Sequence, residues 1–97
     1  MPFEIVLAPE ALDDLRALRA YDRAKVLEAM NAHLRHHPTQ VSRSRTKRLR
    51  GMDRPQFRLR VDDVRVFYDV IGTRVEVLAI VEKSEAAAWL ARHGSVA

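Results

Sequence analysis

The sequence contains no cysteine, and it has only three glycines and four prolines in 97 residues. The absence of cysteine excludes a disulfide scaffold, a thiolate metal site and a thiol nucleophile, and it suits a reducing compartment. No apolar run approaches the roughly 20 residues that a membrane-spanning helix needs. The first residues also lack the basic and apolar regions of a signal peptide. We therefore expect a cytoplasmic protein with no membrane partner.

The residues that are present are typical of one small folded domain. Apolar residues make up 47% of the chain and charged residues 31%, and 97 residues fit a single domain spanning positions 1–97. The net charge is +4, but its distribution is more informative than its size. The basic residues of the central stretch are Arg43, Arg45, Lys47, Arg48, Arg50, Arg54, Arg58, Arg60 and Arg65. Only three aspartates oppose them there, which favours a nucleic-acid partner.

The N-terminal half predicts a strand followed by two helices. Residues 3–7 are strand formers, and Pro9 suits the first turn of a helix that we expect to end near Arg19. Asp22 is the expected N-cap of a second helix, which Pro38 stops, and the turn between the helices is expected at Tyr21. The apolar positions at helical spacing are Leu12, Leu15 and Leu18, then Val26, Leu27, Met30 and Leu34.

The C-terminal half predicts an antiparallel sheet and a last helix. Residues 39–47 are polar and read as a loop, and residues 47–51 form either a short strand or an extended arm. Strand-like runs follow at 56–61, 64–70 and 75–81, separated by short turns at 62–63 and 72–73. Residues 83–93 predict a helix that ends at Gly94. The fold class is therefore α+β in two layers: an N-terminal strand, a helix hairpin, an antiparallel sheet of three or four strands and a short C-terminal helix.

The turn at 62–63 fixes which side chains share a face of the sheet, because side chains alternate along a strand. It pairs Arg60 with Arg65, and it places both on one face with Arg58. The expected core face consists of Phe57, Leu59, Val61, Val64, Val66 and Tyr68. In the next hairpin we expect Tyr68 to face Val77, Val66 to face Ala79, Phe67 to face Leu78, and Arg65 to face Ile80.

The three arginines have two interpretations. Like charges directly across two strands repel each other, so a function is one reason to keep them together. They would make a cradle for phosphate groups and would stabilise the charge that develops during RNA cleavage. The alternative is an ordinary solvated face whose charge is relieved by nearby acids, namely Asp69, Glu76 and Glu82.

An apolar patch of Phe67, Leu78 and Ile80 is expected beside these arginines. Such a patch needs a cover. The C-terminal helix could supply it through Trp89 and Leu90, or a helix of a partner protein could do so. Elsewhere, His33 and His37 are four residues apart on a helix, but no third ligand is near, so we expect surface histidines and no metal site.

At this point the sequence resembles the RelE/ParE superfamily of bacterial toxins. The resemblance is carried by Leu49-Arg50-Gly51, by the strands 57–60 and 64–68, and by the last strand at 75–81. It implies a two-layer fold with the first strand beside the last. It also implies the toxin of a type II toxin–antitoxin pair, which a cognate antitoxin protein neutralises in a hetero-oligomer.

The RelE-like branch of this superfamily cleaves mRNA in the ribosomal A site without a metal or cofactor. The resemblance implies that the catalytic residues are Arg58, Arg60, Arg65 and Lys83. It further predicts that RNA contacts Lys47, Arg48 and Arg50. The antitoxin is expected to bind Phe67, Leu78, Ile80 and Trp89.

The sequence departs from the cleaving members after the last strand. Many of them have a His-Arg pair there and a tyrosine shortly beyond, and the corresponding residues here are Glu82, Lys83 and Ala87. Glu82 could act as a general base or as a salt-bridge partner. Two alternatives to an mRNA endonuclease therefore stay open: a ParE-like inhibitor of DNA gyrase, and a degenerate toxin that binds antitoxin without nuclease activity.

Overall fold

Residues 2–97, which the computed structural model describes, form three helices and seven strands. The helices are α1 (Pro9–Ala17), α2 (Ala20–His33) and α3 (Lys83–His93). The strands are β1 (Glu4–Leu7), β2 (Thr46–Arg48), β3 (Met52–Arg54), β4 (Phe57–Val61), β5 (Val64–Ile71), β6 (Arg74–Glu82) and β7 (Ser95–Val96). The predicted C-terminal helix has the bounds that the sequence indicated, and no helix in the described part is long and apolar enough to cross a membrane.

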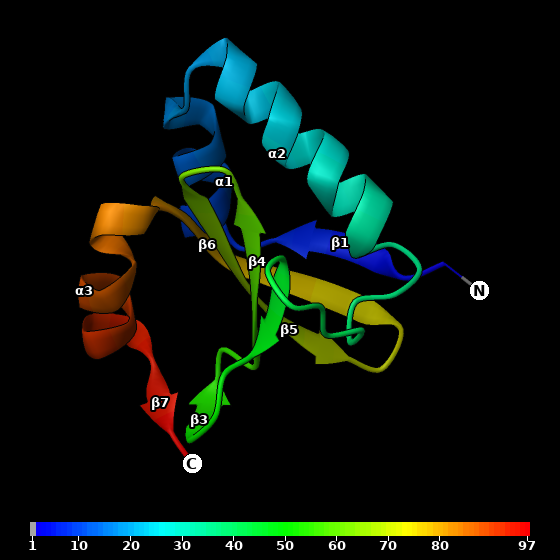
Figure 1. The fold of residues 1–97 in the computed structure, drawn as a ribbon, viewed down its shortest axis with the longest axis vertical. Coiled ribbons are helices and arrows are strands. Elements are labelled where there is room, and N and C mark those ends of the chain that lie inside the picture. Colours follow the sequence, from blue (N-terminus) through cyan, green and yellow to red (C-terminus); the bar gives the residue numbers. More distant parts are fainter. Residues whose placement is uncertain (1) are drawn as a thin grey trace.

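Five strands form the main sheet in the order β1-β6-β5-β4-β2 (Figure 1). β1 runs parallel to β6, and the other neighbours are antiparallel. The first strand thus lies beside β6, the last long strand, as the resemblance implied. Residues 46–48 pair with β4, so the expected arm begins as an edge strand. The α+β fold class is confirmed.

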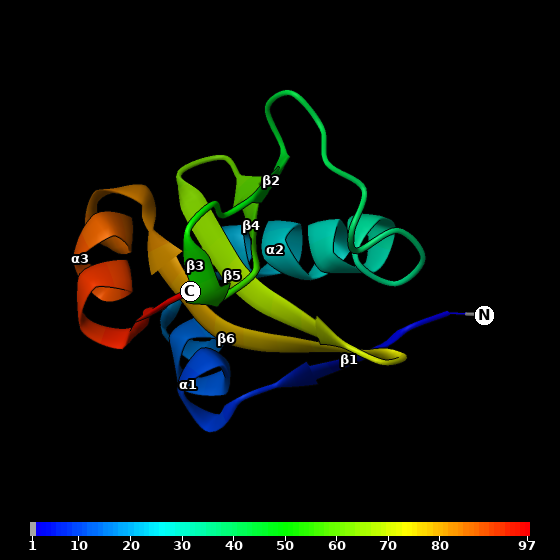
Figure 2. The same ribbon diagram turned by 90° about the horizontal axis from the view of Figure 1, so that it is seen from below.

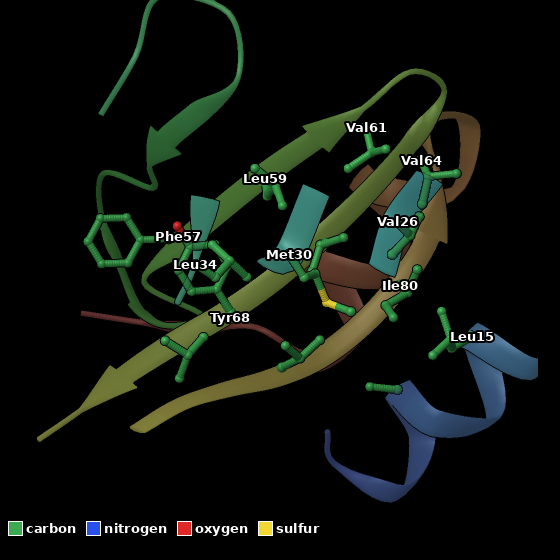
Figure 3. Close-up of a cluster of buried hydrophobic side chains, with 14 residues drawn as sticks. Leu15, Val26, Met30, Leu34, Phe57, Leu59, Val61, Val64, Tyr68 and Ile80 are labelled. Atoms are coloured by element: carbon green, nitrogen blue, oxygen red, sulfur yellow. The ribbon is translucent and has the colours of Figure 1, made fainter. Parts of the chain in front are cut away.

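The core lies between one face of this sheet and the pair α1–α2 (Figure 3). The sheet contributes an uninterrupted apolar surface because every second residue of β4 and β5 is apolar. Leu59, Val66 and Tyr68 are fully buried there, against Val26 and Met30 of α2. Each such side chain contributes roughly 1.5–3 kcal/mol by its burial, so this layer holds the sheet to the helices.

The phenol of Tyr68 is a polar group within the core. It donates a hydrogen bond of 2.6 Å to the backbone oxygen of Pro38, which satisfies it. Burial raises the pKa of Tyr68 well above its usual range, so the phenol stays protonated and remains a donor. The bond ties the chain just beyond α2 to the centre of the sheet.

The connection between α1 and α2 differs from the prediction. α2 begins at Ala20, so Asp22 lies in its first turn and the predicted N-cap at Asp22 is wrong. The turn is organised instead by Arg23, whose guanidinium donates to the backbone oxygens of Leu15, Arg16 and Leu18 at 2.7–3.2 Å. These carbonyls lie at the end of α1, where the usual helical donors are missing, and the oxygen of Leu15 also accepts the N–H of Leu18 at 3.2 Å.

Two apolar residues of this region lie outside the core. Tyr21, expected to be at the turn, is in the first turn of α2 and is 71% exposed. Leu27, expected in the apolar stripe of α2, is 42% exposed. The buried stripe of α2 is narrower than predicted, because only the positions of Val26 and Met30 face the sheet, and Leu34 follows at its end.

A β-bulge in β6 changes the predicted faces of the last strand. The pair Tyr68–Val77 is as expected, but the next pair is Phe67–Ala79, which leaves Leu78 as the extra residue. Beyond the bulge the register is shifted by one, and a shift of one residue turns a side chain to the other face. Ile80 therefore points into the core, where it is 3% exposed, and its predicted place on the opposite face is wrong.

α3 lies against β5 and β6 on the face away from α1 and α2, hereafter the outer face. Its end is held by β7, which pairs with β3 in a separate two-stranded ribbon (Figure 1). A Cβ atom at Gly94 would collide with the side chain of Met52 and with the backbone oxygen of Leu90. The φ of Gly94 is −77°, which suits any residue, so backbone conformation does not require glycine there. The close packing of α3 on the ribbon does.

Candidate functional site

Four cations of three adjacent strands share the outer face. Lys47 of β2 is directly across from Arg58 of β4, and Arg60 of β4 is directly across from Arg65 of β5. The β4–β5 register is the predicted one in all its pairs. We call the set Lys47, Arg58, Arg60 and Arg65 the basic face. At cross-strand spacing of about 5 Å these charges repel one another, so the arrangement costs stability unless an anion is present.

The acids expected to relieve this charge lie elsewhere. Asp69 and Glu76 pair with Arg54, at 3.4 and 2.9 Å, and Glu76 also approaches Arg74 at 3.9 Å. No ion pair within residues 2–97 includes Glu82 or a member of the basic face. The interpretation of a neutralised face is therefore wrong for this end of the sheet, and the expected salt bridge of Glu82 is absent from the described residues.

Arg58 occupies the centre of the basic face. It is half-buried between Lys47 and Phe67, and its Nε is buried with no hydrogen-bond partner in residues 2–97. Burial and then the charges of Arg65 and Arg60 lower the pKa of the Arg58 guanidinium. A buried donor without an acceptor is costly, and an anionic ligand would remove that cost.

Arg65 and Arg60 face each other but differ in availability. Arg65 is only 7% exposed, and its Nη1 donates to the backbone oxygens of Asp62 at 2.7 Å and Val64 at 3.1 Å. Burial, followed by the charge of Arg60, lowers the pKa of Arg65, and Asp63 opposes this shift. Arg60 is exposed, and its guanidinium forms no hydrogen bond with residues 2–97. Arg65 thus braces the hairpin, while Arg60 is free to contact a ligand.

Lys83 lies at the tip of the β4–β5 hairpin, as the first residue of α3. Its backbone N–H donates to the oxygen of Asp63 at 2.6 Å, which joins α3 to the hairpin. A hollow of about 460 Å³ is lined by Asp63, Glu82, Lys83 and Ser84. Glu82 and Lys83 are exposed on its rim, and Ala87 is exposed on α3. The structure therefore places a carboxylate and an amine where α3 meets the β4–β5 hairpin, and Glu82 is paired across the strands with Val64, the neighbour of Arg65.

The three residues predicted to bind RNA do not share one surface. Lys47 belongs to the basic face. Arg48 points to the other side of β2, where its guanidinium lies 5.1 Å from the ring centre of Phe57 in a cation–π contact. Arg50 is exposed in the turn before β3. Adjacent strand residues point to opposite faces, so Arg48 and Lys47 lie on different sides of β2, and RNA binding by all three residues stays a prediction.

The residues predicted to bind antitoxin are likewise divided. Phe67 is 1% exposed and stacks under Trp89, with ring centres 5.1 Å apart and planes inclined by 6°. Leu78, in the bulge, lines a hollow of about 520 Å³ that Trp89 also lines. Ile80 lies on the core face. In the chain on its own, α3 therefore covers Phe67 and Leu78, the two residues of the predicted patch that lie on the outer face. This agrees with the interpretation in which the C-terminal helix supplies the cover.

The four-residue spacing of His33 and His37 predicts surface histidines that could share a face of the helix. The structure places His33 and His37 in one small cavity with Arg45. No group of three or more potential metal ligands occurs within residues 2–97. The four-residue spacing of the histidines was the available signal, but the third member comes from a loop whose course the sequence did not indicate.

Comparison with known proteins identifies the family. Residues 5–87 match the family model described as the ParE toxin of the type II toxin–antitoxin system parDE. No curated protein matches the sequence of the chain. The family match spans β1 to the first turns of α3 and includes all of the basic face.

Similar solved structures come from toxin–antitoxin complexes. A chain of the RelBE2 complex from Mycobacterium tuberculosis is 25% identical, with a TM-score of 0.69 over 84% of this chain and 99% of that one. A chain of the archaeal RelE–RelB complex from Pyrococcus horikoshii is 20% identical, with a TM-score of 0.70 over 86% and 97%. A chain of the RelB–RelE complex from Methanococcus jannaschii is 13% identical, with a TM-score of 0.67 over 87% and 96%. Together with the family match, they show that this chain belongs to the ParE toxin family of the RelE/ParE superfamily and is the toxin of a type II toxin–antitoxin system.

Proposed function

We propose that this toxin is a metal-independent endonuclease that cleaves mRNA on the ribosome and so inhibits translation. The observation that supports the proposal is the basic face, where four cations lie together and none of them forms an ion pair within residues 2–97. A phosphodiester backbone would supply the missing negative charge. Guanidinium groups are suited to this, because they bind phosphate oxygens through two parallel hydrogen bonds.

The chemistry assigns different roles to the candidate residues. Attack of a ribose 2′-hydroxyl on the neighbouring phosphorus builds negative charge on the phosphoryl oxygens, and fixed cations lower that barrier. Arg60 is exposed and would contact those oxygens directly. Arg58 would bind a phosphate while satisfying its buried Nε. Arg65 would stabilise this charge without direct contact with the phosphate, because its guanidinium already donates hydrogen bonds to the hairpin backbone.

Proton transfer would fall to the hollow where α3 meets the β4–β5 hairpin. A general base must take the 2′-hydroxyl proton, and a general acid must protonate the leaving 5′-oxygen. The carboxylate of Glu82 is the candidate base and the ammonium of Lys83 the candidate acid, since both line this hollow. They replace the His-Arg pair of other cleaving members.

The test is a reconstituted translation reaction with a defined mRNA. Wild-type toxin should produce discrete cuts that primer extension maps within the ribosome-covered codons, and no cuts should appear on the same mRNA without ribosomes. Added cognate antitoxin should abolish the cuts. Intact mRNA in a reaction where toxin is present and folded would contradict the proposal.

The family match favours inhibition of DNA gyrase as a second candidate function. The matching family model is the one named for ParE, and the ParE-like branch acts on gyrase. A supercoiling reaction with purified gyrase separates the two candidates. Loss of supercoiling at toxin concentrations that leave mRNA intact would identify this toxin as a gyrase inhibitor.

We also propose that the cognate antitoxin engages Phe67, Leu78 and Trp89. Phe67 and Leu78 are apolar residues of the outer face, and α3 covers them through Trp89 although the helix has no fully buried residue of its own. Because α3 buries so little of its own surface on the sheet, a segment of the antitoxin could displace it. Hydrogen exchange with and without antitoxin tests this: protection in residues 65–82 with altered exchange in 83–93 is expected, and protection confined to residues 9–37 would contradict it.

A further inference from the structure

The charge of the molecule is concentrated in one segment. Residues 29–52 contain no aspartate or glutamate, but they contain six lysines or arginines and three of the four histidines. With neutral histidines this segment carries +6, more than the +4 of the whole chain, so the rest of the protein is slightly acidic. The segment leads from α2 through β2, and its loop projects beyond the sheet edge in Figure 2. Such a concentration of charge attracts a polyanion.

A cavity of about 80 Å³ lies where this segment folds back on the end of α2. It is lined by Ala32, His33, His37, Gln40, Arg45 and Thr46. A single water needs roughly 10–15 Å³, so the cavity has room for a tetrahedral oxyanion. No carboxylate lines it, and the side chains of His33, His37 and Arg45 form no hydrogen bond or ion pair with any residue of the described chain. Its donors are therefore available to a ligand.

The loop that carries Arg45 is held in place before any ligand binds. The hydroxyl of Ser42 accepts hydrogen bonds from the backbone N–H groups of Arg45 at 3.1 Å and Thr46 at 3.0 Å. The N–H of Ser42 donates in turn to the oxygen of Thr46 at 3.0 Å. A binding group that is fixed in advance loses less entropy on binding.

The cavity adjoins the basic face. The backbone oxygen of Arg45 accepts a hydrogen bond of 2.8 Å from the N–H of Arg60, so positions 45 and 60 are neighbours across β2 and β4. Lys47 follows two residues later and faces Arg58. Cations thus continue from the outer face, over the edge strand β2, to the end of α2.

We infer that this cavity is a second phosphate subsite for RNA, in which Arg45, His33 and His37 hold a backbone phosphate beyond the one at the basic face. The inference rests on the proposed action on RNA. It specifies the path of the RNA strand over the protein surface, which runs from Arg60 across β2 toward α2. It also predicts a dependence on pH, because two of the three donors are histidines.

The direction of that dependence follows from the surroundings of His33. Burial and then the charge of Arg45 lower the pKa of His33, so its neutral form predominates near neutral pH. The other charged or titratable groups of this region are Arg35, His36 and His37, and no acid lines the cavity. A bound phosphate would offset Arg45 and favour the imidazolium, as does the C-terminal end of α2. Binding then takes up a proton, and affinity rises as the pH falls.

The experiment measures the affinity of purified toxin for a short, dye-labelled single-stranded RNA by fluorescence anisotropy, without ribosomes and at constant ionic strength. Uptake of about one proton predicts roughly tenfold tighter binding when the pH falls from about 7.5 to about 6. The double variant His33→Gln/His37→Gln should lose this pH dependence. Arg45→Ala should weaken binding at both pH values, and His36→Gln, next to the cavity but not lining it, should behave as wild type.

Each outcome bears on the subsite separately from the cleavage activity. Wild-type affinity that does not change with pH, or a double variant that keeps the full dependence while folded by circular dichroism, overturns the inference. A second measurement is the imidazole signal of His33 in NMR titrations: added RNA should raise its pKa, and an unchanged pKa overturns the subsite. A toxin that shows these effects but cuts no mRNA would refute the proposed nuclease and leave the subsite standing.

Discussion

Arginine side chains at the two ends of the outer face have opposite surroundings. At one end Arg54 is paired with Asp69 and Glu76, and Asp69 also accepts the backbone N–H of Gln56 at 2.7 Å. At the other end Arg58, Arg60 and Arg65 have no acidic partner in the described chain. The same residue type thus serves the fold at one end and is kept free at the other. Unpaired like charges are what separates a candidate site from ordinary surface.

The largest effect is expected from Arg60→Ala. Arg60 is exposed and unpaired, so its removal should lower mRNA cleavage about 100- to 1,000-fold while changing the free energy of unfolding by no more than about 0.5 kcal/mol. Primer extension and urea denaturation measure the two quantities. Arg74→Ala, an exposed arginine at the other end of the same sheet, is the matched control and should cleave normally. Equal cleavage by both variants would remove the distinction between the two ends.

Arg65→Ala should act on stability. It removes two hydrogen bonds to the oxygens of Asp62 and Val64, and the lost bonds and the empty volume should lower the free energy of unfolding by about 1–3 kcal/mol. Urea denaturation of this variant beside Arg60→Ala measures the difference within one cross-strand pair. If both variants are as stable as wild type, Arg65 is not the brace of the hairpin that its contacts indicate.

Arg54→Ala tests the paired end. Arg54 and Glu76 pair near the surface, but Asp69 is buried and would lose its cationic partner, so the free energy of unfolding should fall by about 1–2 kcal/mol. In RNA binding, the slope of log affinity against log salt should be unchanged for Arg54→Ala and reduced by roughly 0.7 for Arg60→Ala. A reduced slope for Arg54→Ala would show that the paired end also contacts RNA.

The smallest effect concerns His33 and the pH dependence of stability. Its pKa is lowered in the folded state, so the unfolded chain binds a proton more readily. The free energy of unfolding should therefore fall as the pH is lowered below about 6.5, and it should level off below the folded pKa. Thermal unfolding across this range should show a smaller slope for His33→Gln. An identical slope would mean that the cavity does not hold His33 neutral.

The part of the sheet that was predictable from sequence is the part that alternates. In β4 and the first three residues of β5, arginine alternates with apolar residues, so the turn at 62–63 fixes every pair of the hairpin. β6 reads Leu78-Ala79-Ile80-Val81, and a continuous apolar run carries no information about faces. For that reason the sequence did not predict the bulge at Leu78, and it therefore did not predict that Ile80 faces the core.

The candidate site was predictable to the same degree. The shared face of Arg58, Arg60 and Arg65 followed from β4 and β5 alone. Their differences did not, because the bonds of Arg65 to the hairpin and the buried Nε of Arg58 depend on three-dimensional packing. The ribbon of β3 and β7 was also missed, since its strands are two or three residues long and have no periodic pattern.

The parallel pairing of β1 with β6 has a consequence for the synthesis of the toxin. Glu4 is paired with Arg74, about seventy positions later, so the sheet closes only when β6 is available. The hairpins of β4, β5 and β6 are local and should form first, whereas closure of such a long loop is slow. At about 5–20 residues per second, the ribosome needs roughly 3–13 s to add the residues between the two strands. During that interval a nascent chain exposes the edge of β1 and the apolar side of the helices, and it cannot yet act as a toxin.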